Sequence, residues 1–125
     1  MGIDIYAEWR GQTKREHSAI VTEWFSTGGG GVGYLREAYH GEPYATRFLC
    51  AEAFESENGE AYIPAAKLRE RLEKTLELVE ERERTIYQSD AEAIEEAKQS
   101  YRDFVALCEQ KEKETGCAVR IVASY

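Results

Sequence analysis

The first clear pattern in the chain is an alternation of apolar and polar side chains over residues 3–9. The apolar side carries Ile3, Ile5, Ala7 and Trp9, and the polar side carries Asp4, Tyr6 and Glu8. Because successive side chains of a strand point to opposite faces, this pattern predicts a strand with one buried face. Alternation also predicts strands over residues 44–50 and 117–124. Both faces of the last strand are fairly apolar, so we expect it to be an inner strand, paired with residues 3–9 or with residues 44–50.

The strongest pattern lies in the second half of the chain, where apolar side chains recur every three or four residues. It starts after Pro64, which suits the first turn of a helix, breaks near Gln88, resumes after the expected cap Asp90 and ends at Gly116. The apolar positions are Leu68, Leu72, Leu76, Val79 and Ile86 in the first helix and Ile94, Ala97, Tyr101, Phe104 and Cys108 in the second. The short connection between the two helices predicts an antiparallel hairpin.

Leu78, Val105 and Leu107 widen the apolar stripe, as expected if the hairpin also covers a sheet. The sequence therefore predicts a two-layer α+β fold, with a small, mostly antiparallel sheet packed against a long antiparallel helical hairpin. We expect one domain over residues 1–125. It comprises a sheet-forming and glycine-rich part (1–63), the hairpin (64–115) and a C-terminal strand (117–124).

The segments between the first strand and the hairpin have weaker patterns. Thr13 and Glu16 have the spacing of a capping box, which predicts a helix from residue 14 to about residue 24. Ala19, Ile20, Trp24 and Phe25 fall near helical spacing, although residues 20–22 suit a strand equally well. Residues 34–39 are expected to form one or two helical turns, and residues 52–60 an acidic connection that ends in an Asn-Gly turn.

Residues 26–48 concentrate glycine, tyrosine and basic side chains. We interpret the run Gly28–Gly31 as a mobile hinge that leads into a corner anchored by tyrosines, because glycine loses the most backbone freedom on ordering. The alternative is a site that holds an anion or stacks a base, since arginine forks match phosphate and aromatic faces accept rings. Its candidate residues are Tyr34, Arg36, Tyr39, His40 and Arg47. Gly28, Gly30 and Gly33 match G-x-G-x-x-G through composition alone, so no dinucleotide site is expected.

Composition changes this picture little. The 125 residues, 42% hydrophobic and 32% charged, are typical of a soluble globular protein. Three separated cysteines without C-x-x-C spacing favour a reduced, cytoplasmic setting, and no stretch suits a membrane span. His40 with Cys50, or the histidines with the cysteines, lack the spacing of a catalytic pair or a zinc site. We therefore expect no catalytic residues, no metal and no cofactor.

The net charge of −8 bears on binding partners. No segment forms a basic stripe, which disfavours direct binding of nucleic acid, and a protein partner with a basic surface fits the sign better. Two acidic regions are candidate contact surfaces, although Arg82, Arg84 and Lys98 dilute the first. The hairpin contributes Glu73, Glu77 and Glu81, expected to form an unpaired ladder, together with Glu92, Glu95 and Glu96. The connection contributes Glu52, Glu55 and Glu57.

Three motifs give the chain a resemblance to a known family. They are the opening MGIDIY with Trp9, the stretch GYLREAYHG over residues 33–41, and the close IVASY. With these the chain resembles a family of small, uncharacterised proteins encoded by bacteria and prophages. The resemblance carries no activity or site, and implies only a bacterial or mobile-element setting.

The function expected from the sequence is a non-enzymatic protein-interaction module. In the setting that the resemblance implies, it would be an accessory or counter-defence inhibitor of a host nucleic-acid-handling complex. The alternative is a protein that binds or sequesters a nucleotide or another anion through residues 28–47. The oligomeric state stays open, because the wide apolar stripe could cover its own sheet, a second copy in a homodimer, or both.

Overall fold

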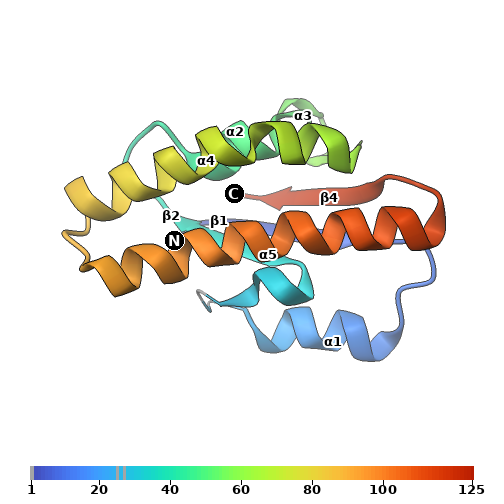
Figure 1. Cartoon of the computed structure of the whole chain (residues 1–125). Helices are drawn as coiled ribbons and strands as arrows, with labels where there is room; N and C mark the ends of the chain where they lie inside the picture. Colours follow the sequence, from blue (N-terminus) through green and yellow to red (C-terminus); the bar gives the residue numbers. More distant parts are fainter. Residues whose placement is uncertain (1, 25, 27) are drawn as a thin grey trace.

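A computed structural model of the chain describes residues 2–24, residue 26 and residues 28–125. Two residues of the predictions lie outside this range. They are Phe25, which has helical spacing, and Met1, which opens the MGIDIY motif. The elements in chain order are β1 (Gly2–Glu8), α1 (Lys14–Thr22), the 3₁₀ helix η1 (Gly29–Val32), β2 (Tyr34–Ala38), α2 (Ala45–Leu49), α3 (Ala51–Glu55), β3 (Glu60–Ile63), α4 (Ala65–Thr85), α5 (Ala91–Thr115) and β4 (Val119–Ser124). The fold is α+β, as predicted, and α4 and α5 lie side by side along the sheet (Figure 1).

The four strands form an antiparallel sheet in the order β2-β1-β4-β3. β4 is an inner strand, as its two apolar faces predicted, and it pairs with β1 on one side and β3 on the other. Ile5 lies opposite Ala123, and Ala7 lies opposite Ile121. These side chains are buried, and they belong to the same apolar cluster as residues of the hairpin. The predicted alternation of β1 therefore sets which face of the sheet meets the helices.

The helical hairpin is confirmed, with boundaries set by local capping. Asp90 accepts a hydrogen bond from the backbone N–H of Ala93, and Gly116 ends α5 with a φ of 74°, in the left-handed region. Leu68 and Phe104 are completely buried between the two layers, whereas Ile86, just beyond α4, is 39% exposed. The buried apolar stripe of α4 thus ends at Val79, about two turns earlier than its spacing suggested.

Helix α1 is also confirmed, and it begins with the predicted capping box. The Thr13 hydroxyl accepts from the backbone N–H of Glu16, and the Glu16 carboxylate accepts from the backbone N–H of Thr13. Two backbone donors at the start of the helix are satisfied in this way. Residues 20–22, for which a strand was the alternative, belong to this helix.

Two predicted elements are wrong. Residues 34–38 form strand β2 rather than helical turns, because they pair with β1 from Tyr34 opposite Tyr6 to Ala38 opposite Gly2. Residues 45–49 form helix α2 rather than a strand, so of the two expected partners of β4 only β1 pairs with it, and β3 takes the other side. In both places tertiary contacts override the weak local preference. The acidic connection is also more ordered than expected, since it contains α3 and the first residue of β3.

The glycine run is packed rather than a free hinge. Gly29 and Gly30 are buried in η1, and a Cβ atom added to Gly30 would lie 1.9 Å from the carbonyl oxygen of Ser100 on α5. Gly33 follows with a φ of 95°, which glycine adopts without strain, and the chain then enters β2. The absence of side chains allows η1 to approach the backbone of α5 closely.

We expect Gly30→Ala to lower the free energy of unfolding by about 1–3 kcal/mol, because the added methyl group collides with the α5 backbone. Gly31→Ala is the matched control, since nothing lies within 4 Å of its added Cβ. Its effect should stay within about 1 kcal/mol. Urea unfolding of both variants measures the difference, and equal stabilities would contradict the close packing of η1 on α5.

Candidate functional site

A buried ion pair joins β2 to the C-terminal half of α4. The Nε of Arg82 lies 3.0 Å from a carboxylate oxygen of Glu37, and the two residues are 4% and 7% exposed. The Arg82 guanidinium also donates to the carbonyl oxygens of Ala38, Gly41 and Pro43. Arg82 therefore holds the loop that follows β2 as well as the strand itself.

The Glu37 carboxylate also binds the first turn of helix α2. Its carboxylate accepts from the backbone N–H of Ala45 at 2.8 Å, from the backbone N–H of Thr46 at 3.0 Å and from the Thr46 hydroxyl at 2.6 Å. These are N–H groups that a helix leaves without a partner in its first turn. A carboxylate from a neighbouring strand thus caps α2, which explains why residues 45–49 are helical.

Sequence reasoning missed this pair, and it treated Arg82 as an exposed cation that dilutes the acidic patch. A signal was present, because Arg82 follows Val79 by three residues and continues the spacing of Leu68, Leu72 and Val79. A charged residue at a buried helical position requires a partner. The position of Glu37 relative to Arg82, however, depends on the sheet register and not on the helix pattern.

Of the predicted ligand residues, Tyr34 and Arg36 bind within the protein. The Tyr34 hydroxyl donates to Oδ1 of Asp4 at 2.6 Å, and Nη1 of Arg36 donates to the same oxygen at 2.8 Å. Tyr34 is fully buried, with its ring 5.9 Å from that of Tyr6 and 6.1 Å from that of Trp24. Tyr34 is therefore the packing anchor that the first interpretation of residues 26–48 expected.

The remaining predicted ligand residues lie elsewhere. Tyr39 is 40% exposed and meets Tyr44 edge-on, and His40 meets Tyr87 in the same way. Arg47 pairs with Glu42 at 3.2 Å and lies over the rings of Phe54 and Tyr125. The five residues therefore do not converge on one anion site.

A cavity of about 360 Å³ lies between β2, the end of α4 with the turn that follows, and the first half of α5. We call it the tip cavity, because the α4–α5 turn forms the tip of the hairpin (Figure 1). Of the predicted ligand residues, Tyr34 and Arg36 line it. The polar residues that complete the wall include Glu37, Arg82, Glu83, Ser89, Ser100 and Tyr101. The sequence did not predict this cavity, because its walls come from separate segments of the chain, Ser26 included.

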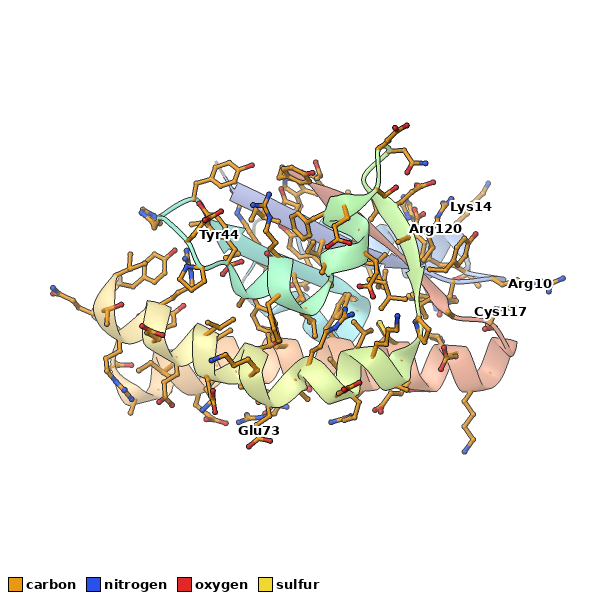
Figure 2. All side chains as sticks on the ribbon, turned by 90° about the horizontal axis from the view of Figure 1, so that it is seen from above. Arg10, Lys14, Tyr44, Glu73, Cys117 and Arg120 are labelled. Atoms are coloured by element: carbon orange, nitrogen blue, oxygen red, sulfur yellow. The ribbon has the colours of Figure 1, made fainter. Side chains whose placement is uncertain are left out.

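The acidic side chains of the hairpin are partly paired. Glu77 lies 3.7 Å from Lys74, and Glu95 pairs with Arg102, so the predicted ladder of unpaired acids is interrupted. Within the described part of the chain, no lysine, arginine or histidine nitrogen lies within 4 Å of the carboxylates of Glu73, Glu81, Glu92 and Glu96, which we call the hairpin acids. Figure 2 shows Glu73 on the side of α4 that points away from the sheet.

The second predicted acidic region lies around α3, away from the α4–α5 turn (Figure 1). Glu52 forms two hydrogen bonds of 2.7 Å with Arg71 and lies 3.5 Å from Lys67. The hydrogen bonds from Arg71 lower the pKa of Glu52 to about 2. Glu55 and Glu57 are exposed. Of these three acids, Glu52 is therefore neutralised by basic side chains of α4.

Reactive or metal-binding groups do not gather among the described residues. Cys50 and Cys108 are buried, and burial raises the pKa of both thiols, to about 12 for Cys108. Such thiols stay protonated and are weak nucleophiles. No group of three or more His, Cys, Asp or Glu side chains among the described residues is arranged to hold a metal ion.

In the part of the chain that the structure describes, no helix has the length and apolar character needed to cross a bilayer. Comparisons with protein-family models, with curated proteins and with solved structures found no match to this chain. Its function is therefore inferred from its own geometry and charge.

We expect Arg82→Met to destabilise the protein by about 3–5 kcal/mol, because it leaves the buried Glu37 carboxylate without its cation. Arg84→Met is the matched control, since Arg84 is exposed and pairs with Glu80 on the same helix. Its effect should stay below about 0.5 kcal/mol. Urea unfolding measures both, and a loss below about 1 kcal/mol for Arg82→Met would show that the pair is dispensable.

The Glu52–Arg71 pair should make stability depend on pH. The folded-state pKa of Glu52, about 2, lies below its ordinary value of 4.5, so the stabilisation is fully present above pH 4.5 and is lost as pH falls towards 2. Glu52→Gln should therefore cost about 1–2 kcal/mol at pH 7 and progressively less below pH 4.5. Urea unfolding at pH 7, 4 and 3 tests this. Glu55→Gln, at an exposed residue, should show no such trend, and a constant deficit for Glu52→Gln would argue against the assignment.

Proposed function

We propose that this chain is a non-enzymatic interaction protein that binds a partner with a basic surface through its helical hairpin. The observation that carries the proposal is the unequal use of charge within the fold. Arg36, Arg71 and Arg82 are engaged by carboxylates inside the protein, whereas the hairpin acids have no such partner among the described residues. Their carboxylates are exposed and available to a complementary surface.

The proposed contact surface is restricted to the hairpin acids. Glu52 is engaged by Arg71, and Glu55 and Glu57 lie outside the hairpin, at the end of α3 and just after it. A nucleic-acid-handling complex is the class of partner that we propose, because its proteins expose lysine and arginine to contact phosphates. An acidic protein that covers such a surface would act as an inhibitor. The resemblance to prophage-encoded proteins is consistent with this role.

A second candidate function is retention of a small molecule, and the tip cavity is the observation that favours it. Sequence reasoning placed such a ligand on residues 28–47 and expected an anion. Arg36 and Arg82 line the cavity, but each is already paired with a carboxylate, of Asp4 and Glu37 respectively. These contacts favour a neutral or cationic ligand over a nucleotide.

The interaction proposal is tested by affinity capture from a bacterial lysate at low salt. We expect the chain to retain a basic protein, and Glu92→Gln with Glu96→Gln to weaken its capture about tenfold because two exposed charges are removed. Glu55→Gln with Glu57→Gln is the matched control, since it changes net charge equally outside the hairpin. It should change capture by less than about threefold.

The affinity of each variant for the recovered partner is then measured with purified proteins. Equal losses in both double variants would show that net charge acts rather than the hairpin surface. Recovery of no specific protein at low salt would count against an interaction role.

A further inference from the structure

The tip cavity has the size of a small-ligand site. Its volume of about 360 Å³ falls at the lower end of the range of roughly 300–1,000 Å³ that is common for ligand pockets. Leu35 and Val79 contribute apolar wall, and Tyr87 and Tyr101 contribute aromatic rings. A ligand with a short apolar body and one polar group fits this combination.

The Tyr101 hydroxyl is an unused polar group in this wall. Tyr101 is 5% exposed, and within the described residues its hydroxyl makes no hydrogen bond to protein. No enclosed side-chain nitrogen or oxygen of the described residues lacks a partner, so this hydroxyl is not sealed in and opens on the cavity that Tyr101 lines. Burial raises its pKa well above the ordinary value, so it is a neutral hydroxyl that can accept a hydrogen bond from a ligand.

The charges in the wall leave one carboxylate without a cation. Arg36 is matched by Asp4 at 2.8 Å, and Arg82 by Glu37 at 3.0 Å. Glu83 accepts a hydrogen bond from the Ser89 hydroxyl at 2.6 Å, but no cationic side chain of the described residues lies within 4 Å of it. The uncompensated charge among the residues that line the cavity is therefore negative, which favours a positively charged ligand group.

We propose that the tip cavity binds an organic ammonium group, with Glu83 as its counter-ion and the Tyr101 hydroxyl as a hydrogen-bond acceptor. The ring of Tyr87, 37% exposed in the wall, offers a face to the same cation. The ammonium comes either from a free small amine or from a lysine side chain of a partner protein.

Calorimetric titration at pH 7.5 with n-butylammonium, n-butanol and butyrate tests the ligand class. We expect saturable binding of butylammonium at one site and no binding of the neutral and anionic probes. Glu83→Gln should weaken binding about tenfold or more, because it removes the counter-ion and keeps the shape. Tyr101→Phe should weaken it severalfold, and Glu73→Gln, on the far side of α4, should leave it unchanged within twofold.

The variants suit this test, because the Tyr101 hydroxyl bonds no described residue and glutamine at position 83 can still accept from Ser89. Thermal unfolding checks that each variant folds as the parent does.

A lysine derivative blocked at its backbone amine and carboxyl group distinguishes the two sources of the ammonium group, a free amine and a partner's lysine. Binding at least as tight as that of butylammonium indicates a partner's lysine, and its rejection indicates a free amine.

Three results would overturn the inference. They are equal binding of butanol and butylammonium, unchanged affinity in Glu83→Gln, and no binding of either amine probe. None of these results tests the role of the hairpin acids, because Glu73 is the only one of them that is changed, and it serves as a control. A failure at the cavity is therefore distinguishable from a failure of the proposed protein interaction.

Discussion

The ion pair between Glu37 and Arg82 is the contact on which the middle of this fold depends. It joins β2 to α4, and through the remaining bonds of its two side chains it also fixes the loop after β2 and the start of α2. Both groups are almost completely buried, so each needs the other to offset the cost of burying its charge. Five residues of helix and a connecting loop are thereby positioned by one pair of side chains.

The same region determines where a ligand could lie. The pair, with Arg36 and Asp4, neutralises the cationic groups along one wall of the tip cavity. Glu83 and the Tyr101 hydroxyl face that cavity with capacity for further bonds. On the other side, the small residues of η1 let the chain approach α5 closely before it enters β2. The cavity is thus a consequence of how strand, helix ends and glycine segment meet.

The distribution of charge links the fold to the proposed interaction. An acidic chain of this size could neutralise its carboxylates evenly over its surface. Here Arg36, Arg71 and Arg82 are paired with acids of the sheet and α3, and exposed acids without a cation remain on the hairpin and around α3. Acids left unpaired at a surface contribute little to stability and much to the sign of the local field.

The sequence by itself determined the hairpin, β1, the inner position of β4 and the caps of α1 and α5. Each of these follows from spacings of a few residues, because helix stripes, strand alternation and capping bonds are local. Only the tertiary structure decided that residues 34–38 form a strand and residues 45–49 a helix, and only it created the tip cavity. Those features depend on groups such as Glu37 and Arg82, which are distant in sequence, and no local periodicity encodes which distant side chains will meet.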